Sequence, residues 1–374
     1  MKKILLLIVC LGMSWQAFAF DLDQIQIHGF ASQGYLLSNR YNYLNAETED
    51  GTVEFNEFGL NVMSSMTDRL RLGIQLLARD LGDDGNDEIT VDWAFGDYRY
   101  RNWLGVRVGQ FKRALGMYNQ SRDIDAARTG VFLPFGGYYE GYRIAQKSVK
   151  GAELYGTIPG SSFGSFEYQI QYGTLDSGFE SYYSSGETTV DVANNAYNLY
   201  LKWNTPLDGL KVIGEFDQFA WTTTTTMDES EMIYDTDFTE WVVGFEYIRG
   251  NLTCAAEYNE RKNEMGSFYT FTSQDYYGML NYRLTDWLEL GTSYSVSYDD
   301  KDDKDGDNMA LRGLPKAAAW RKDLAVSTRF DINEYWIVKL EGHWINGLSG
   351  VSGYKLENPS EDGFLFAAKM TVSF

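Results

Sequence analysis

The last twelve residues of the chain, GFLFAAKMTVSF (363–374), alternate between apolar and polar side chains. Successive side chains of an extended strand point to opposite faces, so Lys369, Thr371 and Ser373 share one face. A terminal strand of this kind needs a pairing partner and an apolar environment for its other face. That other face holds Phe364, Phe366, Ala368, Met370, Val372 and Phe374.

The N-terminus has the order of a secretory signal peptide. Lys2 and Lys3 precede an apolar run over 4–13, and the small-residue site Ala17-Phe18-Ala19 follows. We expect a signal peptide at 1–19 and a mature chain at 20–374. The apolar run is too short for a membrane anchor, which needs roughly 20 residues in helix. The expected mature chain keeps a single cysteine, Cys254, so no intramolecular disulfide can form.

Composition narrows the class of protein. Aromatic residues make up 16% of the chain, there are 27 Tyr and 37 Gly, and Pro occurs only 5 times. No Pro/Gly/Ser-rich linker or change of periodicity divides the chain, which favours one domain. The formal net charge of -21 disfavours nucleic-acid binding, because phosphate contacts need a basic surface. No segment of the expected mature chain has the long apolar run of a membrane helix.

Alternation recurs along the chain in segments of about ten residues. No Asp, Glu, Lys or Arg occurs on the apolar faces, whereas the opposite faces are rich in charged residues. Unpaired charges in a dry core are prohibitively costly, so the polar face must meet water and the apolar face must meet lipid. Examples of the apolar faces are Leu70/Leu72/Ile74/Leu76, Ile89/Val91/Trp93/Phe95, Tyr197/Leu199/Leu201/Trp203 and Trp241/Val243/Phe245/Tyr247.

The pattern predicts an all-β fold, a 16-stranded antiparallel transmembrane β-barrel in which the last strand closes against the first. Seven short turns alternate with eight long connections, as expected for short periplasmic turns and long extracellular loops. For the strand near 149–158, the sequence does not decide which residues face outward and which face the lumen. The long connections are expected at about 39–54, 80–88, 112–146, 174–195, 221–237, 260–273, 299–320 and 346–362.

The most specific local segment is GVRVGQFKRALGMYNQ (105–120), followed by Arg122-Asp123 and Phe132-Leu133-Pro134. It resembles the region where a strand enters the third loop in Gram-negative outer-membrane porins related to the phosphate-selective porin group. The resemblance implies an outer-membrane homotrimer, passive diffusion without a cofactor, and a third loop folded into the lumen. It also implies recognition of the C-terminal strand by the barrel-assembly machinery. The dense run of lumen Lys and Arg expected for an oligophosphate channel is absent.

The 35-residue connection at 112–146 is the candidate constriction, because its apolar pieces favour packing on the inner wall over disorder. Inward charges are predicted to segregate, and a field across the lumen would orient solutes and screen ions. Solvated lumen positions without selectivity are an equally simple interpretation. Arg71 and Arg107 are the first candidates to line the constriction. The full basic set is Arg69, Arg71, Arg79, Arg107, Lys112 and Arg113; the acidic set is Asp123 and Asp125 in the loop with Glu167, Glu215, Asp217, Glu240, Glu246 and Glu257 on the wall.

Other functions have weaker support. Only His28 and His343 are available as histidine bases for a hydrolase site, and no spacing places either beside a nucleophile. The acidic stretch 299–307 fails the calcium-loop pattern and suggests an exposed loop, with divalent ions as possible bridges to lipopolysaccharide. We therefore expect no catalytic, metal or cofactor site. The expected function is passive diffusion of small hydrophilic solutes or ions across the outer membrane, with a barrel hydrolase and a structural or adhesive barrel as alternatives.

Overall fold

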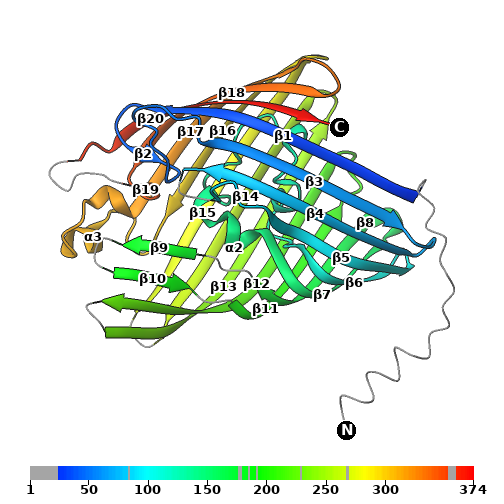
Figure 1. Cartoon of the computed structure of the whole chain (residues 1–374), viewed down its shortest axis with the longest axis horizontal. Coiled ribbons are helices and arrows are strands. Elements are labelled where there is room, and N and C mark those ends of the chain that lie inside the picture. Colours follow the sequence, from blue (N-terminus) through cyan, green and yellow to red (C-terminus); the bar gives the residue numbers. More distant parts are fainter. Residues whose placement is uncertain are drawn as a thin grey trace, which may run out of the picture.

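The computed structural model describes residues 24–82, 85–175, 179–183, 186–190, 193–227, 230–266, 269–352 and 359–374. The expected signal peptide, 1–19, lies outside these residues. Sixteen antiparallel strands form a closed barrel (Figure 1). They are β1 (Ile25–Ser38), β3 (Phe55–Ser65), β4 (Leu70–Leu81), β5 (Thr90–Arg101), β6 (Leu104–Lys112), β7 (Ser148–Pro159), β8 (Ser165–Leu175), β11 (Ala193–Asn204), β12 (Leu210–Met227), β13 (Ser230–Arg249), β14 (Leu252–Met265), β15 (Tyr269–Thr285), β16 (Leu288–Tyr298), β17 (Trp320–Asp331), β18 (Trp336–Gly347) and β20 (Asp362–Ser373).

The terminal strand closes the barrel, as the sequence predicts. β20 pairs with β1 from Phe30–Ser373 to Ser38–Leu365, and its other edge pairs with β18. Phe374 continues this pairing, because its amide donates to the carbonyl of Gly29 and its carbonyl accepts from the amide of Gly29. Every long edge is therefore hydrogen-bonded, which is the condition for a sheet to be stable in lipid.

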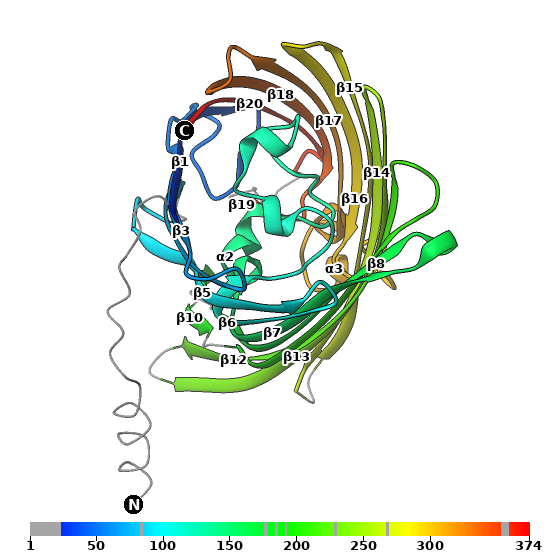
Figure 2. The same ribbon diagram turned by 90° about the vertical axis from the view of Figure 1, so that its right-hand side faces the viewer.

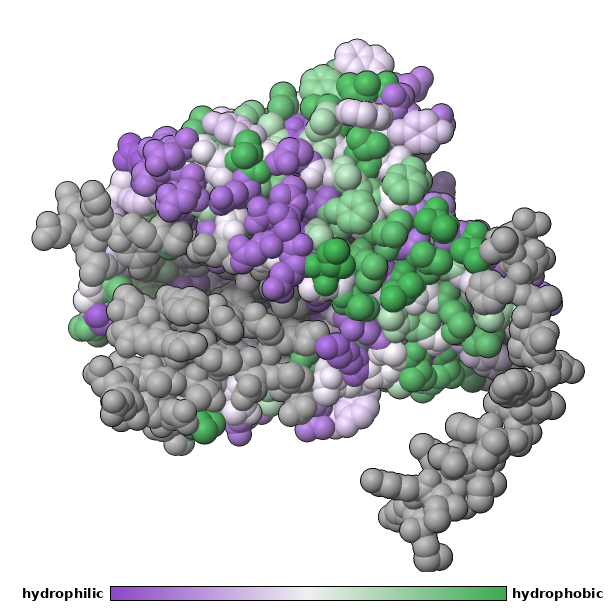
Figure 3. All heavy atoms as spheres, viewed as in Figure 1, coloured by the Kyte–Doolittle hydropathy of each residue, from purple (hydrophilic) through white to green (hydrophobic). Residues whose placement is uncertain are grey.

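The outside of the barrel is apolar along a band that crosses the strands. Figure 3 shows hydrophobic side chains gathered over the right half of one face and hydrophilic ones toward the left. Alternate residues of each strand supply this surface, for example Leu199 and Leu201 on β11 and Trp241 and Val243 on β13, all strongly exposed. Exposed apolar side chains of this extent indicate a surface that meets lipid.

Seven short turns lie at the barrel end that also holds the start of β1 and the end of β20. We call this end the turn side and the opposite end the loop side. The turns span 66–69, 102–103, 160–164, 205–209, 250–251, 286–287 and 332–335.

Two long connections expected on the loop side are replaced by strand. β12 runs to Met227 and β13 begins at Ser230, so most of 221–237 is a paired hairpin. β14 runs to Met265 and β15 begins at Tyr269, so most of 260–273 is also strand. These segments lose hydrophobic alternation because they extend past the apolar band, yet their backbones continue to pair.

The remaining elements are small. The connection after β8 carries the hairpin of β9 (Phe179–Tyr183) and β10 (Gly186–Val190), and β2 (Asn42–Tyr43) pairs with β19 (Val351–Ser352). Among the described residues, no helix has the length and apolar character needed to span a membrane. The helical turns are α2 (Arg143–Lys147), α3 (Asp307–Leu311), η2 (Asn119–Ser121), η3 (Asp125–Ala127), η4 (Glu140–Tyr142), η5 (Ser161–Phe163) and η6 (Lys316–Ala319).

The expected facing of β5 is wrong over half of its length. Ladder pairing passes from Gln75–Trp93 to Leu76–Val91, so Asp92 is an extra residue that forms a bulge. A bulge shifts the alternation by one residue. Val91 therefore faces outward as expected, but Trp93 and Phe95 face the lumen, where their rings stack at 5.2 Å. The structure also settles β7: Leu154 and Ile158 face outward, and Glu153 faces the lumen.

Candidate pore constriction

The connection between β6 and β7, residues 113–147, lies inside the barrel. Figure 2 looks along the barrel and shows this segment, with α2, enclosed by the ring of strands. Its apolar side chains pack on inward-facing apolar residues: Leu115 clusters with Ile213 and Val242, and Tyr138 clusters with Tyr277. Burial of these apolar side chains favours the inward fold of the segment. The backbone amides and carbonyls of the segment must also find hydrogen-bond partners there. We call residues 113–147 the lumen loop.

One side of the lumen carries an acidic wall, made of Glu215, Asp217, Glu240, Glu246 and Glu257. Arg113 reaches it from the start of the lumen loop: its Nε lies 2.7 Å from Asp217 Oδ2 and its Nη2 lies 3.5 Å from Glu240 Oε2. All three side chains are buried. Burial alone would lower the pKa of the Arg113 guanidinium, but Asp217 and Glu240 outweigh burial and raise it.

The backbone of the lumen loop completes the contact with the acidic wall. The amide of Gly116 donates to Glu215 at 2.7 Å, and the amide of Met117 donates to Glu257 at 2.6 Å. Gly116 has φ +54°, a left-handed conformation that favours glycine and lets consecutive amides point at the wall.

Two tyrosine hydroxyls of the lumen loop donate to the same wall. Tyr118 donates to Glu246 at 2.9 Å, and Tyr138 donates to Glu257 at 2.7 Å. Burial, followed by the charge of Glu246, raises the pKa of the Tyr118 phenol, so it stays protonated and remains a donor. The acidic wall is therefore largely occupied by donors of the lumen loop.

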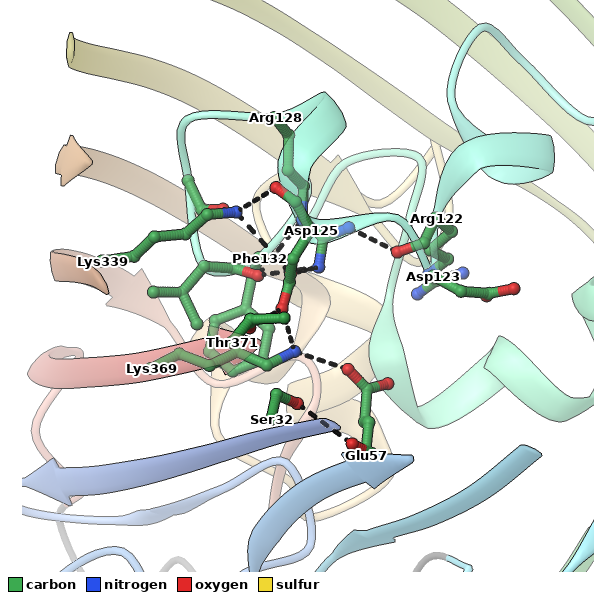
Figure 4. Close-up of polar contacts among 12 residues, drawn as sticks. Ser32, Glu57, Arg122, Asp123, Asp125, Arg128, Phe132, Lys339, Lys369 and Thr371 are labelled. Atoms are coloured by element: carbon green, nitrogen blue, oxygen red, sulfur yellow. Dashed lines mark hydrogen bonds and ion pairs between the residues drawn. The ribbon is translucent and has the colours of Figure 1, made fainter. Parts of the chain in front are cut away.

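The opposite side of the lumen carries a basic wall, made of Arg329, Lys339 and Lys369. Asp125 of the lumen loop faces it: Asp125 Oδ2 lies 2.9 Å from Lys369 Nζ and accepts from the Thr371 hydroxyl at 2.6 Å (Figure 4). Lys339 donates to the carbonyl oxygens of Asp125 and Gly130 at 2.7 and 2.9 Å. Burial would raise the pKa of Asp125, but Lys369 and Lys339 hold it well below its usual value.

A third cluster joins the lumen loop to β3 and β4. Glu140 pairs with Arg79 on β4 at 2.8 Å and with Arg122 at 2.9 Å. Arg143 pairs with Glu57 on β3 at 2.5 Å and with Asp123 at 3.1 Å. Although burial opposes ionisation, the surrounding cations hold the pKa of Glu140 and of Asp123 below the usual carboxyl range. The lumen loop is thus bound on three sides by charges of complementary sign.

The two histidines differ in their surroundings. His343 on β18 is buried, with Nδ1 2.9 Å from Asp323 Oδ1 and Nε2 2.9 Å from Glu341 Oε1. Glu341 also accepts the amides of Val131 and Phe132 at 3.0 Å, so His343 helps to hold another part of the lumen loop. His28 is exposed near the turn-side end of β1.

The turn-side half of the lumen, below the lumen loop, is a vestibule. In most of its ion pairs the cation is more exposed than the acid, the exception being Lys202 and Glu167. The Arg71 side chain is 40% exposed, whereas its partner Asp97, 2.5 Å away, is fully buried. Lys211 is 40% exposed and its partner Glu246 only 14%. Arg107 follows the same rule with buried Glu153 at 2.7 Å, and it also covers the ring of Phe95 at 4.6 Å. The water-facing charge of these pairs is therefore mainly positive.

The structure places the sequence-predicted site residues in three groups. Arg113 pairs with Asp217 and Glu240, and Glu215 beside them accepts the amide of Gly116. The buried network of the lumen loop holds Asp123, Asp125, Arg79 and Lys112, and the vestibule is lined by Arg71, Arg107 and Glu167. Glu167 pairs with Lys202 on the neighbouring strand at 2.7 Å. Arg69 lies at the turn-side rim, at the start of β4.

The sequence predicted that wall arginines face acids across the lumen, and the structure shows a different arrangement for Arg71 and Arg107. Arg71 and Arg107 pair with acids of adjacent strands, Asp97 and Glu153, so much of the expected field across the lumen is neutralised locally. Because of the bulge at Asp92, the alternation did not show that Asp97 faces the lumen. Glu153 was missed because the sequence did not decide which residues of β7 face the lumen. Lys369 could have been found from the alternation of 363–374, which places it on the polar face.

In the described part of the chain, no group of three or more His, Cys, Asp or Glu residues is placed to hold a metal ion. In the stretch 299–307, Asp303 accepts the amides of Asn308 and Met309 at the start of α3.

The sequence matches no protein-family profile and no curated protein. Solved structures do match. OmpT of Vibrio cholerae, in a trimer form, has 12% identity and a TM-score of 0.59 over 94% of this chain and 99% of that one. The anion-selective porin from Comamonas acidovorans has 13% identity and a TM-score of 0.58 over 94% and 99%. The outer membrane channel DcaP of Acinetobacter baumannii has 10% identity and a TM-score of 0.58 over 94% and 97%. At these identities the likeness establishes the fold.

Proposed function

We propose that this protein is an outer-membrane porin through which small hydrophilic solutes or ions diffuse passively. The observation that carries the proposal is the inverted barrel, with an apolar exterior and an ionisable lumen that the lumen loop narrows. Charged side chains such as Arg71 and Lys211 remain exposed inside the barrel, which supports a watery route beside the loop. In this proposal the turn side faces the periplasm and the loop side faces the exterior.

The vestibule favours anions over cations in this proposal. The cation is more exposed than its acid in the pairs of Arg71, Arg107 and Lys211, whereas Glu167 is more exposed than Lys202, so a passing ion meets mainly positive charge. The net charge of -21 does not decide selectivity, because much of it lies on distant loops and salt screens charges beyond about 8–10 Å. One of the structural relatives is itself named an anion-selective porin.

The assembly and partners of the chain are part of the same proposal. A homotrimer is supported by the trimer form of OmpT, which shares the fold. The exposed apolar band supports contacts with outer-membrane lipid. The alternating sequence of β20 and its terminal Phe374 support recognition of this strand by the barrel-assembly machinery. Lipopolysaccharide contacts of the acidic loops belong to this group.

We propose transport without a catalytic step. Both ring nitrogens of His343 are engaged by carboxylates, an arrangement that supports a structural role in holding the lumen loop rather than hydrolysis. His28 lies two barrel strands away, since β20 separates β1 from β18.

Planar-bilayer recordings test the function and the role of Arg107 together. The refolded protein should give discrete conductance steps, and a salt gradient should give a reversal potential of the sign for anion preference. Arg107→Ala should move that potential toward cation preference, because it leaves Glu153 unpaired in the vestibule. Arg107→Lys should restore most of the wild-type value.

Lys262→Ala is the matched control, since Lys262 faces outward on β14 and pairs there with Glu264. It should leave the reversal potential unchanged. A folded barrel without conductance would contradict the porin function. Unchanged selectivity in Arg107→Ala would contradict only the vestibule's role.

A further inference from the structure

A small cavity of about 30 Å³ lies between the lumen loop and the barrel wall. The lumen loop lines one side of it with Phe132, Phe135 and Tyr139, and the wall lines the other with Ser295 of β16 and Arg321 of β17. A space of about 10–15 Å³ holds one water molecule, so the cavity has room for a ligand of only one or two heavy atoms. We call it the Arg321 cavity.

The guanidinium group of Arg321 is buried and incompletely hydrogen-bonded. Its side chain is only 3% exposed, and its Nη2 donates to Asp323 Oδ2 at 2.7 Å. Within the part of the chain that the structure describes, neither Nε nor Nη1 of Arg321 has a hydrogen-bond partner. A buried N–H without an acceptor is costly, and more so when it belongs to a charged group. These two N–H groups therefore need an acceptor that the described residues do not supply.

The acceptors that line the cavity are already engaged. Asp323 accepts from Arg321 at one oxygen and contacts His343 at the other. Glu140 accepts at both of its oxygens from arginines of its own cluster. A water molecule in the cavity would bring two protons that need acceptors, whereas an anion only accepts. Unpartnered donors beside engaged acceptors therefore favour an anion over water.

The charges around the cavity favour the same ligand. Both ring nitrogens of His343 lie 2.9 Å from carboxylate oxygens. Ionised carboxylates only accept hydrogen bonds, so both nitrogens carry a proton and the ring is cationic. His343 and Arg321 thus line the cavity with two cations, and Ser295 adds a hydroxyl that can donate. Of the two acids in the lining, Glu140 is neutralised by its arginine partners.

We propose that the Arg321 cavity binds a small monovalent anion of halide size. The Nε and Nη1 groups of Arg321 and the hydroxyl of Ser295 donate to it. Phe135 of the lumen loop and Tyr43 of β2 cover the same guanidinium, with ring centres 4.0 and 5.4 Å from its carbon. Because the anion fixes the guanidinium beside Phe135, it ties the lumen loop to β17. This inference goes beyond the proposed function and does not depend on conduction.

Bromide is the probe, because its anomalous scattering locates it in crystals of the intact protein. Crystals grown in bromide should show an anomalous peak within hydrogen-bond distance of Arg321. In detergent solution, bromide should raise the unfolding midpoint saturably, because a ligand that binds only the folded state stabilises it. Gluconate at equal ionic strength is the control anion, since it is too large for the cavity. Protease cleavage of the lumen loop should be slower in bromide than in gluconate.

Two variants test the donors separately. Arg321→Met keeps a side chain of similar length beside the rings but removes the donors, and it should lose the anomalous peak and the bromide effect. Ser295→Ala leaves every ion pair intact, and its half-saturating bromide concentration should rise roughly fivefold through loss of one hydrogen bond. Ser273→Ala is the matched control. Ser273 is a buried serine on β15 that donates to the carbonyl of Arg261, and its loss should leave the bromide dependence unchanged.

Several results would overturn the proposal. A cavity that holds water in bromide crystals, with no anomalous peak, would show that no anion is selected. Equal midpoints in bromide and gluconate would show only general screening by salt. Wild-type half-saturation in both Arg321→Met and Ser295→Ala would place the bound bromide elsewhere. Conductance in bilayers tests the porin function separately, so failure of anion binding leaves that function standing.

Discussion

Replacing Arg113 by alanine is the sharpest perturbation of the lumen loop. Arg113 is the loop's buried cation on the acidic wall, 2.7 Å from Asp217 and 3.5 Å from Glu240, and its guanidinium carbon lies 4.8 Å from the ring centre of Phe219. The substitution leaves these carboxylates buried without their cation. The lumen loop is expected to leave the wall, while the sixteen barrel strands stay paired.

The magnitude follows from the burial of this ion pair. Removing one partner of a buried pair costs about 3–5 kcal/mol, because the remaining charge is left uncompensated. At about 1.4 kcal/mol per factor of ten, this cost shifts the equilibrium between docked and undocked loop by a factor of about 150 to about 5,000. The amides of Gly116 and Met117 still hold the wall, so we expect partial opening with frequent exchange.

Single-channel recording in planar bilayers is the assay. Arg113→Ala should have a larger conductance and more current noise than wild type, and the lumen loop should become a site of limited proteolysis. The variant Arg113→Met/Asp217→Asn/Glu240→Gln should restore much of the wild-type conductance, because it replaces the unpaired charges by neutral groups of similar shape. Lys262→Ala, at an exposed ion pair, should behave as wild type.

Wild-type conductance, noise and protease resistance in Arg113→Ala would refute the reasoning, provided that the barrel has folded. Such a result would mean that the contacts of the lumen loop with the basic wall suffice to hold it. Opening in Arg113→Ala without any recovery in the neutral triple variant would show that packing on Phe219, rather than charge, keeps the loop in place.

Asp125→Asn removes the carboxylate that lies 2.9 Å from Lys369 on the basic wall. The docking free energy of the lumen loop should fall by about 3 kcal/mol, and the conductance should rise. Unchanged conductance would exclude this contact as a determinant of loop docking. The second prediction concerns pH. Burial raises the pKa of Asp299 to about 6, above its ordinary value, so its folded form takes up a proton at a higher pH than its unfolded form. Stability should therefore increase by about 1 kcal/mol as pH falls from 7 to 5. Unfolding midpoints at both pH values should show this gain in wild type and not in Asp299→Asn; equal gains in both proteins would assign it to another group.

The sequence determined the barrel because alternation is a local property of a strand. Each residue's neighbours at i±2 share its face, so the faces can be assigned without knowing which strands pair. The rule failed where the geometry is not local. The bulge at Asp92 shifts Trp93 and Phe95 into the lumen, and only the pairing of β5 with β4 reveals it. It also failed on the loop side of β12 to β15, where pairing continues beyond the apolar band.

The sequence predicted which residues make up the candidate site, and the tertiary structure decided how they pair. The sequence placed charged residues in the lumen and identified 112–146 as the loop that narrows it, since its length and apolar pieces are visible in the chain. It did not reveal which charges meet. Arg113 and Asp217 lie 104 residues apart, and Glu57 and Lys369 lie 312 apart. Charge pairing depends on distances between strands that are remote in sequence, and these distances exist only once the barrel has closed.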